Sequence, residues 1–347
     1  MRPAGTARAV LIAAAALVIA LAALVGSLCF GSAAIAPRDV ILALVARIFP
    51  GSSAAMAADP VAITIVWELR LARTLLAGIA GACLGAAGAT LQGLFRNPLA
   101  DPYSLGVSSG AALGAVLAMA AGLRSPLGSG SGVQASAFVG ALLSAALVYA
   151  VARAGRKTAA TTALLLAGAA VGSFLSAAVS LIVSLNDRDL HRVFFWLMGG
   201  FGGKSWPDLT AALVPATASI LLSLGLARPL DLLGAGEEAA SSMGLELKRA
   251  RVLAVTSSSL GAAAAVSAGG VIGFIGLIGP HIARLVVGPG HRRLIPASAF
   301  AGAILLMTAD AVARSVASPL ELPVGVVTAL VGAPLFLRLL AKRGVFA

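Results

Sequence analysis

Long apolar runs separated by short polar interruptions make up most of this 347-residue chain. A helix that crosses a bilayer needs about 20 mainly apolar residues. We predict ten such spans: 9–30, 71–94, 104–122, 133–152, 161–185, 207–227, 252–270, 272–288, 294–314 and 322–341. The predicted fold class is an all-α integral membrane protein, with one transmembrane domain over residues 1–347.

The seventh and eighth spans are the hardest to separate. The chain has no charged residue from Val252 to Gly279, a run too long for one ordinary helix and short for two. Gly269-Gly270 is the natural place for a tight turn. The next span continues through Pro280, so we expect it to be short or irregular. Two short helices beside the membrane are expected at 37–49 and from Leu190 to Met198.

Composition excludes most other classes of protein. The mean hydropathy is +1.00 and 11% of residues are charged, whereas soluble domains carry roughly 25%. Cys29 and Cys83 both lie in apolar runs, and the three histidines are scattered without the spacing of metal ligands. We therefore expect no disulfide, no metal site and no catalytic residue.

The net charge of +12 has two readings, nucleic-acid binding and the excess of basic residues on the cytoplasmic side of membrane proteins. The second is favoured, because with ten spans and an inner N-terminus 16 basic residues fall inside and 9 outside, out of 25. Trp67, Trp196 and Trp206 then fall at the outer boundary.

The run from Ala9 to Leu28 is long enough to be a retained first span. With ten spans and an inner N-terminus, both termini are predicted to be cytoplasmic.

The most polar interruption is the segment 228–251, which this orientation places in the cytosol. Residues 236–243 are predicted to form a short helix with Ala239, Ala240 and Met243 on one face of small residues, ended by Gly244. Such a helix could fit a groove in a cytosolic partner. From composition alone, a solvated loop is an equally good interpretation.

Two glycine-rich stretches imitate nucleotide-binding motifs. Residues 199–205 resemble a phosphate-binding loop, but Met198 occupies the place of its first glycine, and the stretch lies between membrane helices. Residues 234–239 imitate a dinucleotide fingerprint without a preceding strand. We predict that this chain binds neither ATP nor another cofactor.

A second polar interruption covers residues 92–102. Its two prolines predict a tight non-helical turn, in which Asn97 bonds its own backbone. The turn is either a plain connection or a constriction at the inner mouth of a pathway.

Asp310 is the acidic residue closest to mid-membrane depth, and pairing with Arg314 is favoured over a role in ion coupling.

Several long motifs closely resemble the FecCD family, the membrane permeases of binding-protein-dependent ABC importers for iron-siderophores, haem and cobalamin. The matching runs are RLARTLLAGIAGACLGAAGATLQGLFRNPLADPYSLGVSSGAALGA (70–115), FFWLMGGFGG (194–203), GEEAASSMGLELKRARVLA (236–254), GFIGLIGPHIARLVVGPGHRRLIP (273–296) and ADAVARSVASPLELPVGVVTALVGAPLFL (309–337). The resemblance covers nearly the whole chain beyond about residue 60, in order.

This resemblance implies ten spans per subunit and a homodimer in the bacterial inner membrane, with the pathway at the subunit interface. It also implies two cytosolic ATPase subunits, which use ATP and Mg²⁺, and a periplasmic substrate-binding protein. The residues that match functional positions of the family fall into three sets. The ATPase-coupling set is Gly236, Glu237, Glu238, Ala239, Ala240, Met243 and Gly244; the binding-protein docking set is Arg70, Arg73 and Arg314; the cytoplasmic gate is Asn97, Leu99, Thr161 and Thr162.

The resemblance leaves the cargo open among haem, a ferric siderophore and cobalamin. The family usually has proline where this chain has Ala72, a departure that leaves both neighbouring arginines in place. The FFWLMGGFGG run, shared in style by haem and cobalamin permeases, favours haem slightly.

The docking arginines are expected to be exposed. An ion-coupled secondary transporter remains the alternative from another class, and a membrane-bound enzyme is the least favoured.

Overall fold

A computed structural model of the chain describes residues 4–31, 35–123, 131–154, 161–185 and 190–342. All regular secondary structure in these ranges is helical. The elements are α1 (Ala4–Cys29), α2 (Pro37–Ile48), α3 (Ser53–Ala57), α4 (Pro60–Thr64), the π-helix η1 (Ile65–Leu71), α5 (Ala72–Phe95), the 3-10 helix η2 (Pro102–Leu105), α6 (Val107–Ala120), α7 (Ser131–Arg153), α8 (Thr161–Leu185), α9 (Leu190–Met198), α10 (Trp206–Gly225), α11 (Ala227–Gly234), α12 (Glu237–Ser242), α13 (Leu247–Gly269), α14 (Ile275–Val287), α15 (His291–Ser315) and α16 (Val324–Lys342).

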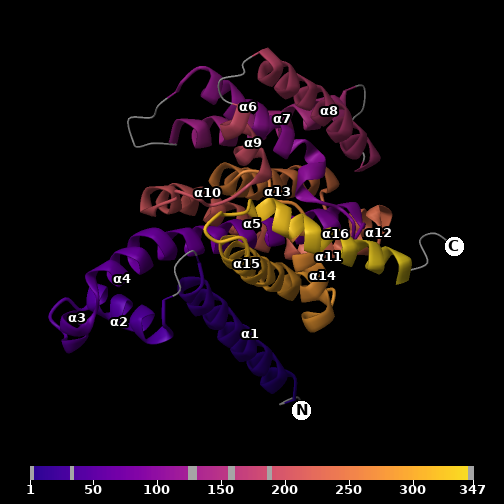
Figure 1. Cartoon of the computed structure of the whole chain (residues 1–347). Helices are drawn as coiled ribbons and strands as arrows, with labels where there is room; N and C mark the ends of the chain where they lie inside the picture. The colour runs from indigo at the N-terminus through magenta and orange to yellow at the C-terminus, as the bar shows by residue number, and fades with distance from the viewer. Residues whose placement is uncertain (1–3, 32–34, 124–130, 155–160, 186–189, 343–347) are drawn as a thin grey trace.

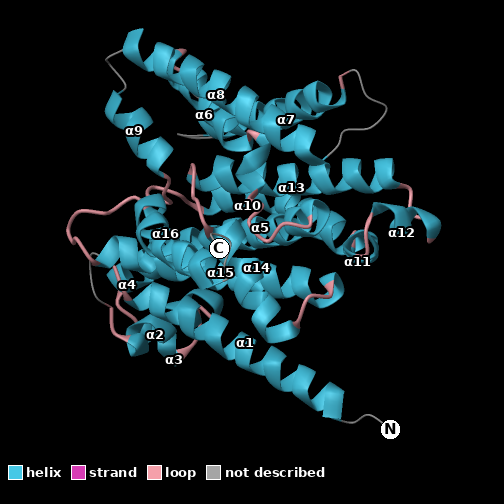
Figure 2. Cartoon of the chain, turned by 90° about the vertical axis from the view of Figure 1, so that its right-hand side faces the viewer, coloured by secondary structure: helices cyan, strands magenta, loops and turns pink. Residues whose placement is uncertain are grey.

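Helix α5 is the centre of the molecule, and nearly all of its side chains are buried. Helices α10, α13, α14 and α15 surround it (Figure 1). In both views α6, α7 and α8 form a layer on one side of this centre, while α1 projects away on the other (Figure 2). The described apolar side chains of α1 up to Val25 are largely exposed, and its last turn is buried.

Small residues let α5 touch its neighbours backbone to backbone. A Cβ added to Gly81 would collide with the carbonyl oxygen of Gly302 in α15, and one added to Gly302 would collide with Gly81. One turn further on, Gly85 faces the carbonyl oxygen of Ser298 in the same way. Because lipid is as apolar as these side chains, such close packing is what holds membrane helices together. The many glycines of the sequence therefore have a structural purpose in this contact.

Six helical segments are long and apolar enough to cross a membrane: Pro60–Phe95, Gly132–Arg153, Thr161–Leu185, Trp206–Gly225, Leu247–Gly269 and His291–Ser315. Four shorter apolar segments occupy the other predicted spans: Ala14–Cys29, Val107–Ala120, Ile275–Val287 and Val324–Arg338. Each of the ten predicted spans thus coincides with an apolar helix in the described part of the chain. Ten complete crossings remain a prediction.

The irregular features expected from the sequence are confirmed. Helix α13 ends at Gly269, and Gly270 adopts a positive φ of 71°. The following helix α14 is only 13 residues long and contains Pro280. Helix α9 runs from Leu190 to Met198, and α2 lies within the short element predicted at 37–49.

Candidate functional site

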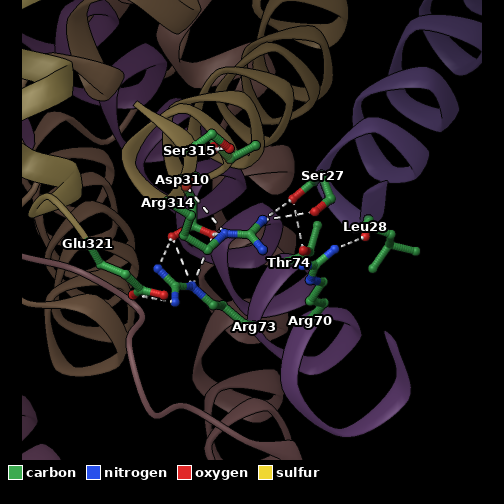
Figure 3. Close-up of polar contacts among 10 residues, drawn as sticks. Ser27, Leu28, Arg70, Arg73, Thr74, Asp310, Arg314, Ser315 and Glu321 are labelled. Carbon is green, nitrogen blue, oxygen red and sulfur yellow. Dashed lines mark hydrogen bonds and ion pairs between the residues drawn. The ribbon is translucent and has the colours of Figure 1, made fainter. Parts of the chain in front are cut away.

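A network of buried charges joins α5, α15 and the loop that follows α15 (Figure 3). The Arg73 guanidinium donates to Asp310 Oδ1 from Nη2 at 2.9 Å and to Glu321 Oε2 from Nη1 at 2.8 Å. Arg314 Nε lies 3.1 Å from Asp310 Oδ2. The Asp310 side chain is fully buried, and the two guanidinium groups compensate its charge. The predicted pairing of Asp310 with Arg314 is confirmed, and Arg73 is a second partner.

Arg314 and a further arginine, Arg70, hold the end of α1. Arg314 Nη2 donates to the Ser27 carbonyl at 2.9 Å and to its hydroxyl at 2.7 Å. The Ser27 hydroxyl in turn lies 2.9 Å from the Thr74 hydroxyl, and Arg70 Nη1 donates to the Leu28 carbonyl at 2.7 Å. Since the last carbonyls of a helix have no partner within it, the two arginines act as a C-terminal cap on α1.

The expectation that the docking arginines are exposed is wrong. Arg70 is 5% exposed, Arg73 7% and Arg314 3%. Their internal partners explain the difference, because carboxylates and helix-end carbonyls compensate guanidinium groups that would otherwise need water. The Asp310–Arg314 pair lies four residues apart on one helix and was readable from the sequence. The Glu321 partner was missed, since nothing in the local pattern links it to Arg73.

At the other end of the chain's long helices, α11 and α12 form the segment predicted for ATPase coupling. Gly236 begins α12 with φ 107° and Gly244 follows its end with φ 84°, so the short helix and its terminal glycine are confirmed. Met243 is 54% exposed, and Glu238 is also exposed. Ala240 is a correction to the predicted contact face, because its side chain is fully buried against the chain itself.

Two ionic contacts attach this segment to long helices. Glu237 of α12 forms an ion pair with Arg251 of α13. Asp231 of α11 accepts hydrogen bonds from the His291 backbone N–H at 2.9 Å and lies 2.7 Å from its Nδ1. His291 is the first residue of α15, so Asp231 caps a helix other than its own. Sequence analysis missed this contact, because the two residues are 60 positions apart.

The turn after α5 has the predicted form. Arg96 adopts a left-handed conformation with φ 49°, and Asn97 Oδ1 accepts a hydrogen bond from the Leu99 N–H at 2.9 Å. The turn lies beside the coupling segment, since a Cβ added to Gly236 would be 3.9 Å from Arg96 Nη1. Leu99 is 38% exposed.

Thr161 and Thr162, the other predicted gate residues, are the first two residues of α8. Two turns later, Gly168 packs against the Ser104 carbonyl just beyond the turn. No hydrogen bond between the threonines and Asn97 or Leu99 is found among the described residues. The gate therefore stays a prediction.

Comparison with known proteins decides the family. The chain matches the FecCD transport family over residues 16–342. This chain belongs to that family. The match spans the buried arginine network, the turn after α5 and the coupling segment.

Relatives and solved structures agree with this membership. The chain is 42% identical to the cobalamin import system permease protein BtuC of Halobacterium salinarum over 283 residues, covering 82% of this chain and 75% of the relative. It is 40% identical to the hemin transport system permease protein HmuU of Yersinia pestis over 279 residues, covering 80% and 84%. A metal-chelate type ABC transporter solved in an inward-facing conformation superposes with a TM-score of 0.81 at 32% identity, over 95% of this chain and 99% of that one.

Proposed function

We propose that this chain is the membrane permease subunit of an ABC importer for a bulky chelate. Haem is the favoured cargo, a ferric siderophore is included, and cobalamin is the alternative within the family. The observation that carries the proposal is the family match over residues 16–342, together with relatives whose names specify hemin and cobalamin. ATP and Mg²⁺ are used by separate ATPase subunits, and this chain binds no cofactor itself.

The proposed assembly is a homodimer of a single-domain permease, 1–347, in the bacterial inner membrane. Each copy crosses ten times, both termini are cytoplasmic, and the pathway lies between the two copies. The six long and four shorter apolar helices support this count. Apolar side chains of α7, α8 and α10 are exposed in the single chain, so lipid or the second copy would cover them. Nucleic acid is not a partner.

On the cytosolic side, a groove of each ATPase would receive the part of the coupling segment from Gly236 to Gly244. Glu238 and Met243 project from α12 and are the residues in best position to contact a partner. The ion pair of Glu237 with Arg251 and the Asp231 cap on α15 would carry movement of this segment into α13 and α15. The inner gate would be formed by Asn97, Leu99, Thr161 and Thr162.

On the outer side, a binding protein would dock over Arg70, Arg73 and Arg314. Burial changes how these residues would act, because their guanidinium groups are already bonded within the chain. Glu321 is the exposed member of the network, with 42% of its side chain accessible. Docking acids from a partner would therefore compete with Glu321 for Arg73.

A reconstituted complex tests this function. The permease, its ATPase and its binding protein are placed in vesicles, and haem and cobalamin are offered separately. ATP-dependent uptake that requires all three components supports the proposal, and the transported compound identifies the cargo. Uptake by the permease alone, driven by a proton or sodium gradient, would instead establish the ion-coupled transporter. Asp310 gives that alternative little support, because two arginines already compensate its charge.

A further inference from the structure

A cavity of about 360 Å³ lies beside the buried arginine network, at the ends of α5, α6, α7, α9 and α10. Arg73 and Glu321 form one edge of it, and α9 contributes Arg192 and two aromatic residues. The glycine-rich loop between α9 and α10, which imitates a phosphate-binding loop in sequence, forms another wall. Arg73 belongs to the docking set, but the other residues that line the cavity belong to none of the three predicted sets.

The charged side chains that line the cavity differ in how closely they are paired with partners. Three basic residues (Arg73, Arg192 and Lys204) and two acidic residues (Asp208 and Glu321) face it. Glu321 is neutralised by Arg73 at 2.8 Å. Asp208 accepts hydrogen bonds from the Ser205 backbone and from Gln134. Both acidic groups thus have close partners, whereas Lys204 has only its longer ion pair with Asp208 and Arg192 makes no ion pair among the described residues.

Lys204 and Arg192 are the underused cations. The Lys204 side chain is 18% exposed and forms an ion pair with Asp208, whose nearest oxygen lies 3.8 Å from Nζ, a long distance for such a pair. Burial lowers the pKa of Lys204, and the nearby Asp208 carboxylate offsets part of this effect. Arg192 is exposed on α9 and makes no ion pair among the described residues. An anion in the cavity would give both cations a further acceptor.

Aromatic surface and a fixed loop complete the cavity. Phe195 is 44% exposed and lies next to Trp196 on α9. The loop is anchored by Phe201, which is fully buried, and by a hydrogen bond of 2.7 Å from Gly200 N–H to the Gly269 carbonyl. Because its walls are held by these contacts, the cavity is formed before any ligand arrives, which lowers the entropic cost of binding.

We propose that this cavity receives a carboxylate substituent at the edge of the cargo, held by Arg192 and Lys204 with the cargo's ring against Phe195 and Trp196. Ligand sites span about 300–1,000 Å³, so a cavity of about 360 Å³ holds one edge of a bulky chelate rather than the whole. A macrocycle with carboxylates on its rim fits this chemistry, and one with neutral amides on its rim lacks the charge. The inference rests on the proposed importer function and narrows its substrate class.

Binding to the purified full-length chain in lipid nanodiscs tests the site without the ATPase or the binding protein. The probes are mesoporphyrin IX, which carries two propionates, and its dimethyl ester, which has the same ring without the charges. Empty nanodiscs are titrated in parallel, so that partition of each probe into lipid is subtracted. We expect the diacid to bind at least tenfold more tightly than the diester, as a charge-assisted hydrogen bond implies.

Arg192→Gln and Lys204→Gln should each weaken diacid binding about tenfold and leave diester binding unchanged, and Arg192→Lys should restore part of the loss. Arg38→Gln, which removes an exposed arginine on α2, is the matched control and should have no effect. Equal binding of the two probes, or unchanged diacid binding in both glutamine variants, would overturn the site. Since Arg192 is exposed, its variant remains informative even if Lys204→Gln lowers the unfolding midpoint.

Uptake assays separate this inference from the function on which it rests. If the complete transporter imports cargo on ATP hydrolysis while both glutamine variants bind the diacid normally, the importer stands and the carboxylate site is wrong. If the diacid binds through Arg192 and Lys204 but no ATP-driven uptake occurs, the site stands as an anion site and the importer function is wrong.

Discussion

The two ends of the molecule use charge in opposite ways. In the arginine network, Asp310 is fully buried, Arg73 bonds Asp310 and Glu321, and Arg314 bonds Asp310 and the end of α1. In the coupling segment, Glu237 and Asp231 are 38% and 44% exposed and each reaches one neighbouring helix. A buried network loses much when one member is removed, whereas an exposed pair contributes little. The first arrangement fixes three helices together, and the second attaches α11 and α12 to α13 and α15 through single, partly exposed contacts.

The largest loss of stability is expected from Asp310→Asn. The substitution removes the charge that compensates Arg73 and Arg314, and breaking a buried pair in this way costs about 3–5 kcal/mol. Unfolding in detergent, followed by loss of helical signal, measures the change. Asp39→Asn on the exposed face of α2 is the control. An effect no larger than that of the control would mean that the network adds nothing to stability.

Gly85→Ala should have the next largest effect. The added methyl group would collide with the Ser298 backbone, and overpacking of this kind costs about 1–3 kcal/mol. Gly26→Ala is the matched control, because a Cβ there meets nothing within 4 Å. The same unfolding measurement applies. Equal stability of the two variants would show that α5 and α15 can separate without cost, contrary to their central role here.

Asp231→Ala tests the contact between the coupling segment and α15. Loss of a capping carboxylate costs about 1 kcal/mol, and Asp231→Asn should cost less because its amide oxygen can still accept from the His291 N–H. If the contact also transmits movement, ATP hydrolysis should continue in the alanine variant while uptake falls. Normal uptake would limit Asp231 to a structural role.

The smallest effect on stability is expected from Glu238→Ala combined with Met243→Ala. Both side chains are exposed, so the unfolding free energy should change by less than about 0.5 kcal/mol. Uptake should nevertheless be largely lost while the ATPase still hydrolyses ATP. Ser242→Ala, on the same exposed helix, is the control. Unchanged uptake in the double variant would contradict the coupling assignment.

Sequence analysis located the helices because the apolar runs themselves determine them. The break at Gly269-Gly270, the short helix from Leu190 to Met198 and the end of α12 at Gly244 all follow from local chemistry. The pairing of Arg73 with Glu321 could not be predicted in this way, because the two residues lie 248 positions apart in the sequence. Burial of Ala240 was also missed, since a short helix with small residues gives no sign of which face its own chain covers.

The π-helix η1 has a geometric consequence for the arginine network. In an α-helix, residues three apart lie on the same face. Arg70 is inside η1 and Arg73 lies just beyond it, and a π-turn is wider because its hydrogen bonds span one residue more. Each residue of such a turn advances by a smaller angle, so the two arginines diverge, one toward α1 and the other toward α15. Deleting one residue of η1 ahead of Arg70 would restore α-helical geometry without changing their spacing, so both arginines would lie on one face and one of those two helices would lose its arginine.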